Sequence, residues 1–273
     1  MRHKRIITIE AAMRSIVFSV VLALLAICSG PAAAADKEVG VVLLHGKWAA
    51  GPGKILPLAR ELERRGFQVA TPTMPWSRDR EYDVPYPQAL EEISAAVKQL
   101  RDKGVQHIII GGQSTGANAA LAYAASGKPV DALILLSPGH TPYAGKMRTA
   151  VESSVGKAAD MIKAGAGGER ASFTDVNQGR SKQVATSASS YFSYFDPQGL
   201  AAMPKSAAAI PKAIPIFMAV GSSDGMSTIA REAIFARAPS HPKSVFSVVN
   251  ADHFSVVNVI APTLIAWLQA LDY

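Results

Sequence analysis

The sequence predicts an α/β fold with a mostly parallel central sheet and helices on both faces. Two observations support this fold class. Continuous apolar runs, which are typical of buried parallel strands, alternate with segments whose apolar residues recur at helical spacing. Glycines, including Gly66 and Gly104, end two of the predicted helices. Alternating strands and helices favour a parallel sheet, because each crossover helix returns the chain to the same sheet edge.

The individual elements follow from these patterns. The predicted strands cover residues 39–44, 67–71, 107–111, 130–137, 215–220 and 244–249. The clearest predicted helices cover residues 53–65, 87–103, 115–126, 146–163 and 255–271. Residues 141–212 break the alternation, because a connection of about seventy residues far exceeds the usual few. We expect this insertion to be either a lid over a site or a loosely ordered segment. The glycines of residues 165–168 would provide a flexible joint, and the aromatic residues of 191–195 would shape a pocket.

The first 35 residues are typical of a signal peptide. Basic residues precede an apolar run at 16–28, which is shorter than the roughly 20 residues of a membrane span. Ala33 and Ala35 form an A-x-A cleavage site before Asp36, so we expect a periplasmic or secreted protein. Met13 is an alternative start. An uncleaved anchor is the less favoured alternative, and cleavage leaves no membrane span in residues 36–273.

Cleavage also changes the charge and the cysteine content. It removes four basic residues and one acidic residue, so the formal net charge falls from +7 to +4. No Lys/Arg cluster remains that would indicate nucleic-acid binding. Cys28 is the one cysteine, and its lipidation is disfavoured because Ile27 stands where a small residue is usual. The mature chain therefore offers no disulfide and no thiol nucleophile.

The pattern G-x-S-x-G occurs twice, and each copy lies between a predicted strand and a predicted helix. The first copy covers residues 112–116 and the second covers residues 221–225. This pattern places a serine on a tight strand-to-helix turn, with glycines where a Cβ atom would clash. Ser114 is the predicted nucleophile, because an acid and a histidine follow it at later strand ends. Ser223 lacks a suitable acid between itself and His253.

The predicted base is His253 and the predicted acid is Asp224. His253 follows the last strand, and no other histidine combines that position with the order serine, acid, histidine. Asp224 stands at the end of the preceding strand. Asp252 is the rival acid, but a residue adjacent to the histidine normally points elsewhere. A histidine oriented by a carboxylate can take the proton of a serine hydroxyl.

The oxyanion hole requires two backbone N–H groups directed at the developing negative charge. Thr115 follows the nucleophile and would supply one of them. The loop after the first strand would supply the other, from Lys47 or Trp48, and Lys47 is preferred. Trp48, Met226 and Phe254 lie near strand ends and are expected to line a substrate pocket, although aromatic residues there are as often core residues.

These residues together resemble the α/β-hydrolase superfamily over nearly all of residues 38–273. The resemblance rests on the loop at residues 45–46, Ser114, Asp224 and His253, in that order and at four strand ends. It differs at the N-terminus, where three residues precede the first strand after the cleavage site, so the hairpin common in this superfamily is expected to be reduced.

The resemblance implies hydrolysis of a carboxylic ester or thioester through an acyl-enzyme, with a small acyl ester as substrate and no cofactor. An amidase or peptidase, an acyltransferase, and an inactive binding protein of the same fold stay open as alternatives. The sequence leaves the acyl chain length and the oligomeric state undetermined. It contains neither H-E-x-x-H nor C-x-x-C, so no metal site is predicted.

Overall fold

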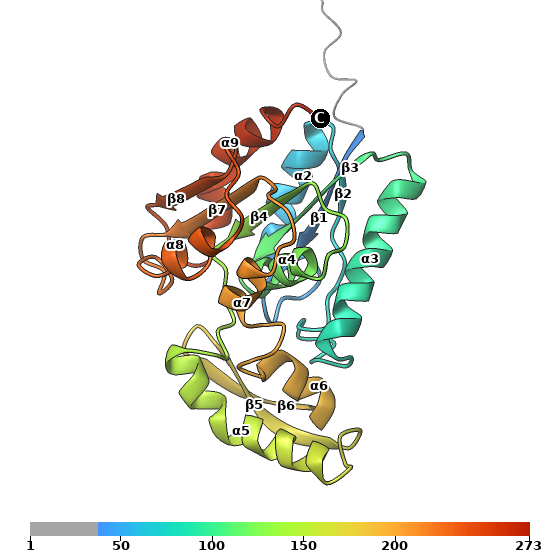
Figure 1. Cartoon of the computed structure of the whole chain (residues 1–273), viewed down its shortest axis with the longest axis vertical. Helices are drawn as coiled ribbons and strands as arrows, with labels where there is room; N and C mark the ends of the chain where they lie inside the picture. Colours follow the sequence, from blue (N-terminus) through green and yellow to red (C-terminus); the bar gives the residue numbers. More distant parts are fainter. Residues whose placement is uncertain (1–37) are drawn as a thin grey trace, which may run out of the picture. The chain divides into compact units, whose positions relative to one another are not determined.

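Six parallel strands form the central sheet, in the order β2-β1-β3-β4-β7-β8 (Figure 1). The computed structural model describes residues 38–273, so the predicted signal segment 1–35, its cleavage site and Cys28 lie outside the described residues. The strands are β1 (Val39–Leu44), β2 (Gln68–Ala70), β3 (His107–Gln113), β4 (Ala132–Leu136), β7 (Ile216–Gly221) and β8 (Val245–Val249).

The strand order reverses once, at β1. This strand pairs with β2 on one side and with β3 on the other. The chain first runs toward the β2 edge and then returns across β1 to β3 and β4. At such a reversal, the loops that follow the two central strands separate and leave a crevice at their carboxyl ends. The topology therefore places a binding crevice beside the loops that follow β1 and β3.

Helices cover both faces of the sheet, and alternate strand residues pack against each helical layer. On one face, Val42, Leu44, Ile108 and Ile110 join a buried cluster with the helices α3, α4 and α7. On the other face, alternate residues of β1, β3 and β4 pack against α2 and α9. The helices of these layers are α2 (Leu56–Arg64), α3 (Tyr86–Asp102), α4 (Thr115–Ala125), α7 (Met203–Ala208) and α9 (Val256–Gln269). The predicted α/β fold with helices on both faces is confirmed.

The insertion follows β4, as expected, and it has regular secondary structure. It begins with the helix α5, continues with an antiparallel hairpin of β5 and β6 and the helix α6, and ends with α7, which returns to the helical layer over the sheet (Figure 1). The bounds are α5 (Gly145–Lys163), β5 (Arg170–Asn177), β6 (Arg180–Ser187) and α6 (Ala188–Phe195). This hairpin was not predicted from the sequence, because polar residues separate the few apolar ones in both strands and no continuous apolar run marks either strand.

Short elements connect the later strands. The segment after β7 holds only α8 (Ala230–Ala233) and the 3-10 turn η3 (Phe235–Arg237), in place of a long helix, and η2 (Gly53–Ile55) precedes α2. Among residues 38–273, no strand pairs with the outer edge of β2. Within these same residues, no helix has both the length and the apolar character of a membrane span.

Candidate active site

Ser114 occupies a strained turn between β3 and α4. Its backbone has φ 57° and ψ −118°, a conformation that few residues other than glycine adopt. The neighbouring backbone is packed against β1 very closely. A Cβ atom on Gly112 or Gly116 would lie 2.5 or 2.2 Å from the Leu44 carbonyl oxygen. Glycine is therefore required at both positions, and the turn presents the Ser114 hydroxyl above the end of the sheet.

The structure brings Ser114, His253 and Asp224 into one hydrogen-bonded chain. His253 Nε2 lies 2.9 Å from Ser114 Oγ, and His253 Nδ1 lies 2.8 Å from Asp224 Oδ2. Because an ionised carboxylate can only accept, Nδ1 carries the proton and Nε2 accepts the serine O–H. The loop of His253 is also held from β3, since Gln113 Nε2 donates to the His253 carbonyl oxygen over 2.9 Å.

The Asp224 carboxylate is buried, with its side chain 2% exposed. Burial opposes its ionisation, but the hydrogen bonds that the carboxylate accepts, first of all from His253, outweigh burial, so the pKa of Asp224 lies below its usual value. The Met226 N–H also donates to Asp224 Oδ1, over 3.0 Å. An ionised Asp224 therefore faces the imidazole at neutral pH and fixes its tautomer.

The two rivals for these roles lie elsewhere. Ser223 is exposed at the surface of the turn that presents Asp224. Asp252 is exposed as well, and its carboxylate accepts hydrogen bonds from the N–H groups of Phe254 and Ser255. Neither side chain contacts the imidazole of His253 through a hydrogen bond among the residues described here. The geometry thus favours the serine and the acid that the order of residues predicts.

The loop after β1 packs directly against Ser114. A Cβ atom on Gly46 would lie 3.4 Å from Ser114 Cβ. The Trp48 N–H donates to the Trp76 carbonyl oxygen over 2.9 Å, so it is already engaged. Neither the Lys47 nor the Thr115 N–H has a hydrogen-bond acceptor within the described part of the chain. Lys47 is therefore the better candidate of the two loop residues for the second oxyanion donor, beside Thr115.

His45 secures the other side of this loop. The residue is fully buried, and its Nε2 accepts the Met74 N–H over 2.9 Å. Trp76 Nε1 donates to the His45 carbonyl oxygen over 2.7 Å. Burial lowers the pKa of His45, which suits a neutral imidazole that accepts at Nε2. The role of His45 in this structure is to hold the loop and not to titrate.

The three predicted pocket residues lie in two different places in the structure. Trp48 and Phe254 line a cavity of about 290 Å³, and neither Ser114 nor His253 is among its lining residues. Phe254 is 41% exposed and meets the His253 ring edge-on. Met226 is packed into the buried cluster between the sheet and the helices, and it is not among the residues that line this cavity. The remaining lining residues are Gly46, Lys47, Ala49, Gly53, Lys54 and Gln113.

The aromatic residues of the insertion belong largely to the core. Tyr191, Tyr194 and Phe195 are fully buried, and Phe192 is partly buried against the same cluster. His140, which follows β4, faces the insertion and not Ser114, since its Nε2 lies 2.7 Å from the Tyr194 carbonyl oxygen. Burial lowers the pKa of His140 to about 3. Whether the insertion opens as a lid stays a prediction.

Two residues beside the site were missed by the sequence analysis. A Cβ atom on Gly139 would lie 2.7 Å from Ser114 Oγ, so only glycine leaves room above the hydroxyl. Asp175 of β5 accepts hydrogen bonds from Lys47 and Trp48 of the loop after β1. Asp175 is two residues from Phe173, so in a strand both side chains lie on the same face. A carboxylate on the same face as a large apolar residue is a pattern that could have drawn attention to Asp175.

No group of three or more His, Cys, Asp or Glu side chains in residues 38–273 is arranged to hold a metal ion.

The chain matches the sequence model of the alpha/beta hydrolase family over residues 41–262. No curated protein matches the chain.

Solved structures of several hydrolases are similar to this fold. A structure from a study of the metagenome-derived lipolytic enzymes LipS and LipT has a TM-score of 0.62 at 14% identity, over 85% of this chain and 94% of that one. A carboxyl esterase from Bacillus coagulans has a TM-score of 0.61 at 15% identity, over 86% and 90%. The monoacylglycerol lipase of Paleococcus ferrophilus has a TM-score of 0.58 at 16% identity, over 84% and 94%. At these identities the likeness shows the fold, and with the family match it establishes that the chain belongs to the alpha/beta hydrolase family.

Proposed function

We propose that this protein is a serine hydrolase that cleaves a carboxylic ester or thioester through an acyl-enzyme. The observation that supports this most directly is the position of the His253 ring. It lies between Ser114 Oγ at 2.9 Å and Asp224 Oδ2 at 2.8 Å, beneath a serine held in a strained turn. This is the arrangement in which an imidazole can activate a hydroxyl for attack on an acyl group.

In the first half of the reaction, Ser114 Oγ attacks the carbonyl carbon while His253 Nε2 takes the serine proton. Asp224 holds the Nδ1–H and stabilises the imidazolium that forms. The carbonyl oxygen gains negative charge, which the Lys47 and Thr115 N–H groups stabilise. When the tetrahedral intermediate collapses, His253 donates its proton to the departing alcohol or thiol, and the acyl group stays on Ser114.

In the second half, water replaces the leaving group. His253 Nε2 takes a proton from water as the water oxygen attacks the acyl carbon, and the same N–H groups stabilise the second oxyanion. Collapse releases the carboxylic acid, and Ser114 Oγ recovers its proton from His253. Every proton in this cycle moves through one ring, so the chain needs no cofactor for the proposed chemistry.

The cavity lined by Gln113 and Phe254, the chain neighbours of Ser114 and His253, favours compact substrates. Its volume of about 290 Å³ lies at the lower end of the roughly 300–1,000 Å³ usual for ligand sites. Trp48 and Phe254 supply aromatic walls, and the exposed Lys54 lies at the rim. We therefore expect hydrolysis of p-nitrophenyl acetate and butyrate to be faster than hydrolysis of the laurate and palmitate.

Labelling with a fluorophosphonate probe tests the proposal, since the probe reacts covalently only with an activated serine. We expect the wild-type protein to be labelled once, at Ser114, and to turn over p-nitrophenyl esters. Matched thioesters and p-nitroanilides in the same assay separate esterase, thioesterase and amidase activity, and added alcohols reveal acyl transfer. A folded wild-type protein without labelling and without turnover would support an inactive binding protein.

We also propose that the protein is exported, on the basis of the apolar run and the A-x-A site of residues 1–35. N-terminal sequencing of the protein recovered from the extracytoplasmic fraction should begin at Asp36. A chain that begins at Cys28 and carries a lipid would show lipoprotein processing instead. Recovery of an unprocessed chain from the cytoplasm would contradict export.

A further inference from the structure

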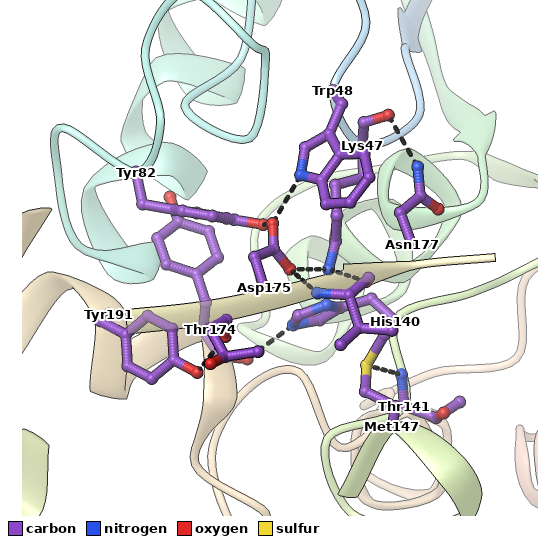
Figure 2. A network of polar contacts seen from close by, with 12 residues as sticks. Lys47, Trp48, Tyr82, His140, Thr141, Met147, Thr174, Asp175, Asn177 and Tyr191 are labelled. Atoms are coloured by element: carbon purple, nitrogen blue, oxygen red, sulfur yellow. Dashed lines mark hydrogen bonds and ion pairs between the residues drawn. The ribbon is translucent and has the colours of Figure 1, made fainter. Parts of the chain in front are cut away.

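Asp175 is a buried carboxylate at the centre of a polar cluster between the insertion and the sheet. It is fully buried on β5, and Figure 2 shows three side chains from other segments pointing at it. Lys47 Nζ donates to Oδ1 over 2.6 Å, Trp48 Nε1 donates to Oδ2 over 2.6 Å, and the Tyr82 hydroxyl donates to Oδ2 over 2.7 Å. The Val176 N–H also donates to Oδ1, over 2.7 Å.

The charges in this cluster neutralise each other away from water. The side chains of Lys47 and Asp175 are 2% and 0% exposed. Burial alone would raise the pKa of the Asp175 carboxyl, but the Lys47 ammonium and the Tyr82 hydroxyl reverse this, so its pKa lies below the usual value. Removal of one partner of a buried ion pair strongly destabilises the folded protein, because the other charge is left buried and unpaired. Separating β5 from Lys47 would have the same consequence.

Lys47 is held at both its side chain and its backbone. Its Nζ donates a second hydrogen bond to the Val176 carbonyl oxygen over 2.9 Å and lies 5.1 Å from the Phe195 ring centroid. Asn177 Nδ2 donates to the Lys47 carbonyl oxygen over 3.3 Å. The hairpin therefore holds the Lys47 side chain and the Lys47–Trp48 peptide unit, which directly follows the N–H proposed as oxyanion donor. This effect does not require a contact between the hairpin and Ser114 or His253.

We propose that Asp175 is a positioning residue for the oxyanion loop at residues 45–48, and that the β5–β6 hairpin is fixed against this loop. The proposal rests on the proposed serine hydrolase function. A hinged lid would have to expose the Lys47–Asp175 ion pair and break the Trp48 and Tyr82 hydrogen bonds with each opening. The cluster instead holds Lys47 in place before substrate binds, and a donor held in place in advance is the condition for electrostatic stabilisation of an oxyanion.

Asp175→Asn tests this proposal, and Phe173→Leu is the matched control. Both side chains are fully buried on the same strand, but Phe173 stacks on Tyr191 and has no polar group that could bond to the oxyanion loop. We expect Asp175→Asn to lower kcat for p-nitrophenyl butyrate by about 100-fold with little change in KM, as when one oxyanion donor is lost. The affinity for a trifluoromethyl ketone inhibitor, which forms the oxyanion, should fall by a similar factor. Phe173→Leu should lower Tm and keep kcat within about threefold.

The double variant Lys47→Met/Asp175→Asn separates positioning from folding. It removes both charges, so no buried charge is left unpaired. It therefore tests the positioning role even if the Asp175→Asn protein does not fold. We expect its Tm to lie close to that of the wild type while kcat stays about 100-fold low. A folded double variant with wild-type kcat, or an Asp175→Asn protein that keeps wild-type kcat and inhibitor affinity, would overturn the proposal.

Hydrogen exchange of residues 45–49 gives a reading that does not depend on turnover. The Trp48 amide, which donates to the Trp76 carbonyl oxygen, should exchange faster in Asp175→Asn than in the wild type or in Phe173→Leu. Unchanged exchange in Asp175→Asn contradicts the positioning role. A wild-type protein without turnover contradicts the proposed hydrolase function, and the exchange experiment still decides separately whether Asp175 holds the loop.

Discussion

The turns at residues 112–116 and 221–225 share the pattern G-x-S-x-G, and each follows a strand of the central sheet, yet they perform different tasks. In the first, both glycines face backbone of β1, and Ser114 adopts φ 57°. In the second, Gly221 packs against the Ala251 carbonyl oxygen, while a Cβ atom on Gly225 would meet nothing within 4 Å.

The fourth position of each turn shows the division of roles. The first turn places the Thr115 backbone N–H directly after Ser114, and the second places the Asp224 carboxylate against His253. The pattern therefore specifies a tight strand-to-helix turn. The neighbouring segments decide which side chain of that turn bonds to His253. Ser114 meets His253 and Gly139, while Ser223 faces solvent.

The largest difference between the turns should appear when each serine is removed. Ser114→Ala should lower kcat/KM for p-nitrophenyl butyrate on the order of 10⁵-fold while the protein stays folded, because the nucleophile is lost. Ser223→Ala should keep nearly wild-type activity, since its hydroxyl is exposed and distant from the imidazole. Steady-state kinetics of both variants provide the measurement, and an inactive Ser223→Ala beside an active Ser114→Ala would reverse the assignment.

The acid of the second turn should give the next largest effect. Asp224→Asn should reduce kcat on the order of 10⁴-fold, because the amide can hold His253 in the wrong tautomer and cannot stabilise the imidazolium. Asp252→Asn is the matched control, since Asp252 is adjacent to His253 and exposed. Equal losses in the two variants, measured at one pH with circular dichroism as the check on folding, would show that Asp224 has no special role.

The glycines of the two turns should differ in stability. Gly116→Ala places a Cβ atom 2.2 Å from the Leu44 carbonyl oxygen, so the free energy of unfolding should fall by about 3 kcal/mol as the turn and β1 move apart. Gly225→Ala has open space around the added methyl group and should be nearly neutral. Urea denaturation curves compare the two variants. A Gly116→Ala protein as stable as Gly225→Ala would mean that the first turn tolerates a side chain.

The smallest expected effect is the pH dependence that the Asp224 charge gives to stability. Because the folded protein holds the pKa of Asp224 below its usual value, the ionised carboxylate stabilises the fold at every pH above the unfolded value of about 3.9. This contribution is lost as pH falls through the lower, folded pKa. The Tm difference between wild type and Asp224→Asn, about 2–4 °C, should therefore be constant from pH 5 to 8 and shrink below about pH 4.

Thr115→Val is the control at the corresponding position of the first turn. It removes a buried hydroxyl that has no hydrogen-bond partner among residues 38–273 and that does not titrate in this range. Its Tm difference from the wild type should not depend on pH between 3 and 8. If the Asp224→Asn difference grows as the pH falls, then the carboxylate is not stabilised by its surroundings in the manner proposed.

Much of the fold and of the site could be predicted because both depend on local patterns. The strand at residues 39–44 was predicted with its observed bounds, since a fully apolar run ends at a polar loop. The order of Ser114, Asp224 and His253 at successive strand ends was also visible in the sequence. The β5–β6 hairpin was not predicted, because its alternation of polar and apolar residues is weak and lies within an unusually long connection.

The sequence by itself determined the alternation of strands and helices, the glycines of the tight turns and the order of serine, acid and histidine that favours Ser114 over Ser223. Each of these is encoded within a few residues or in the order of strand ends along a parallel sheet. Only the tertiary structure decided that Asp175 binds Lys47, 128 residues away, that Gly139 lies above Ser114 and that Trp48 has no free N–H. Periodicity and turn patterns contain no information on which distant segments meet, because that depends on how the insertion packs against the loops at the carboxyl ends of the strands.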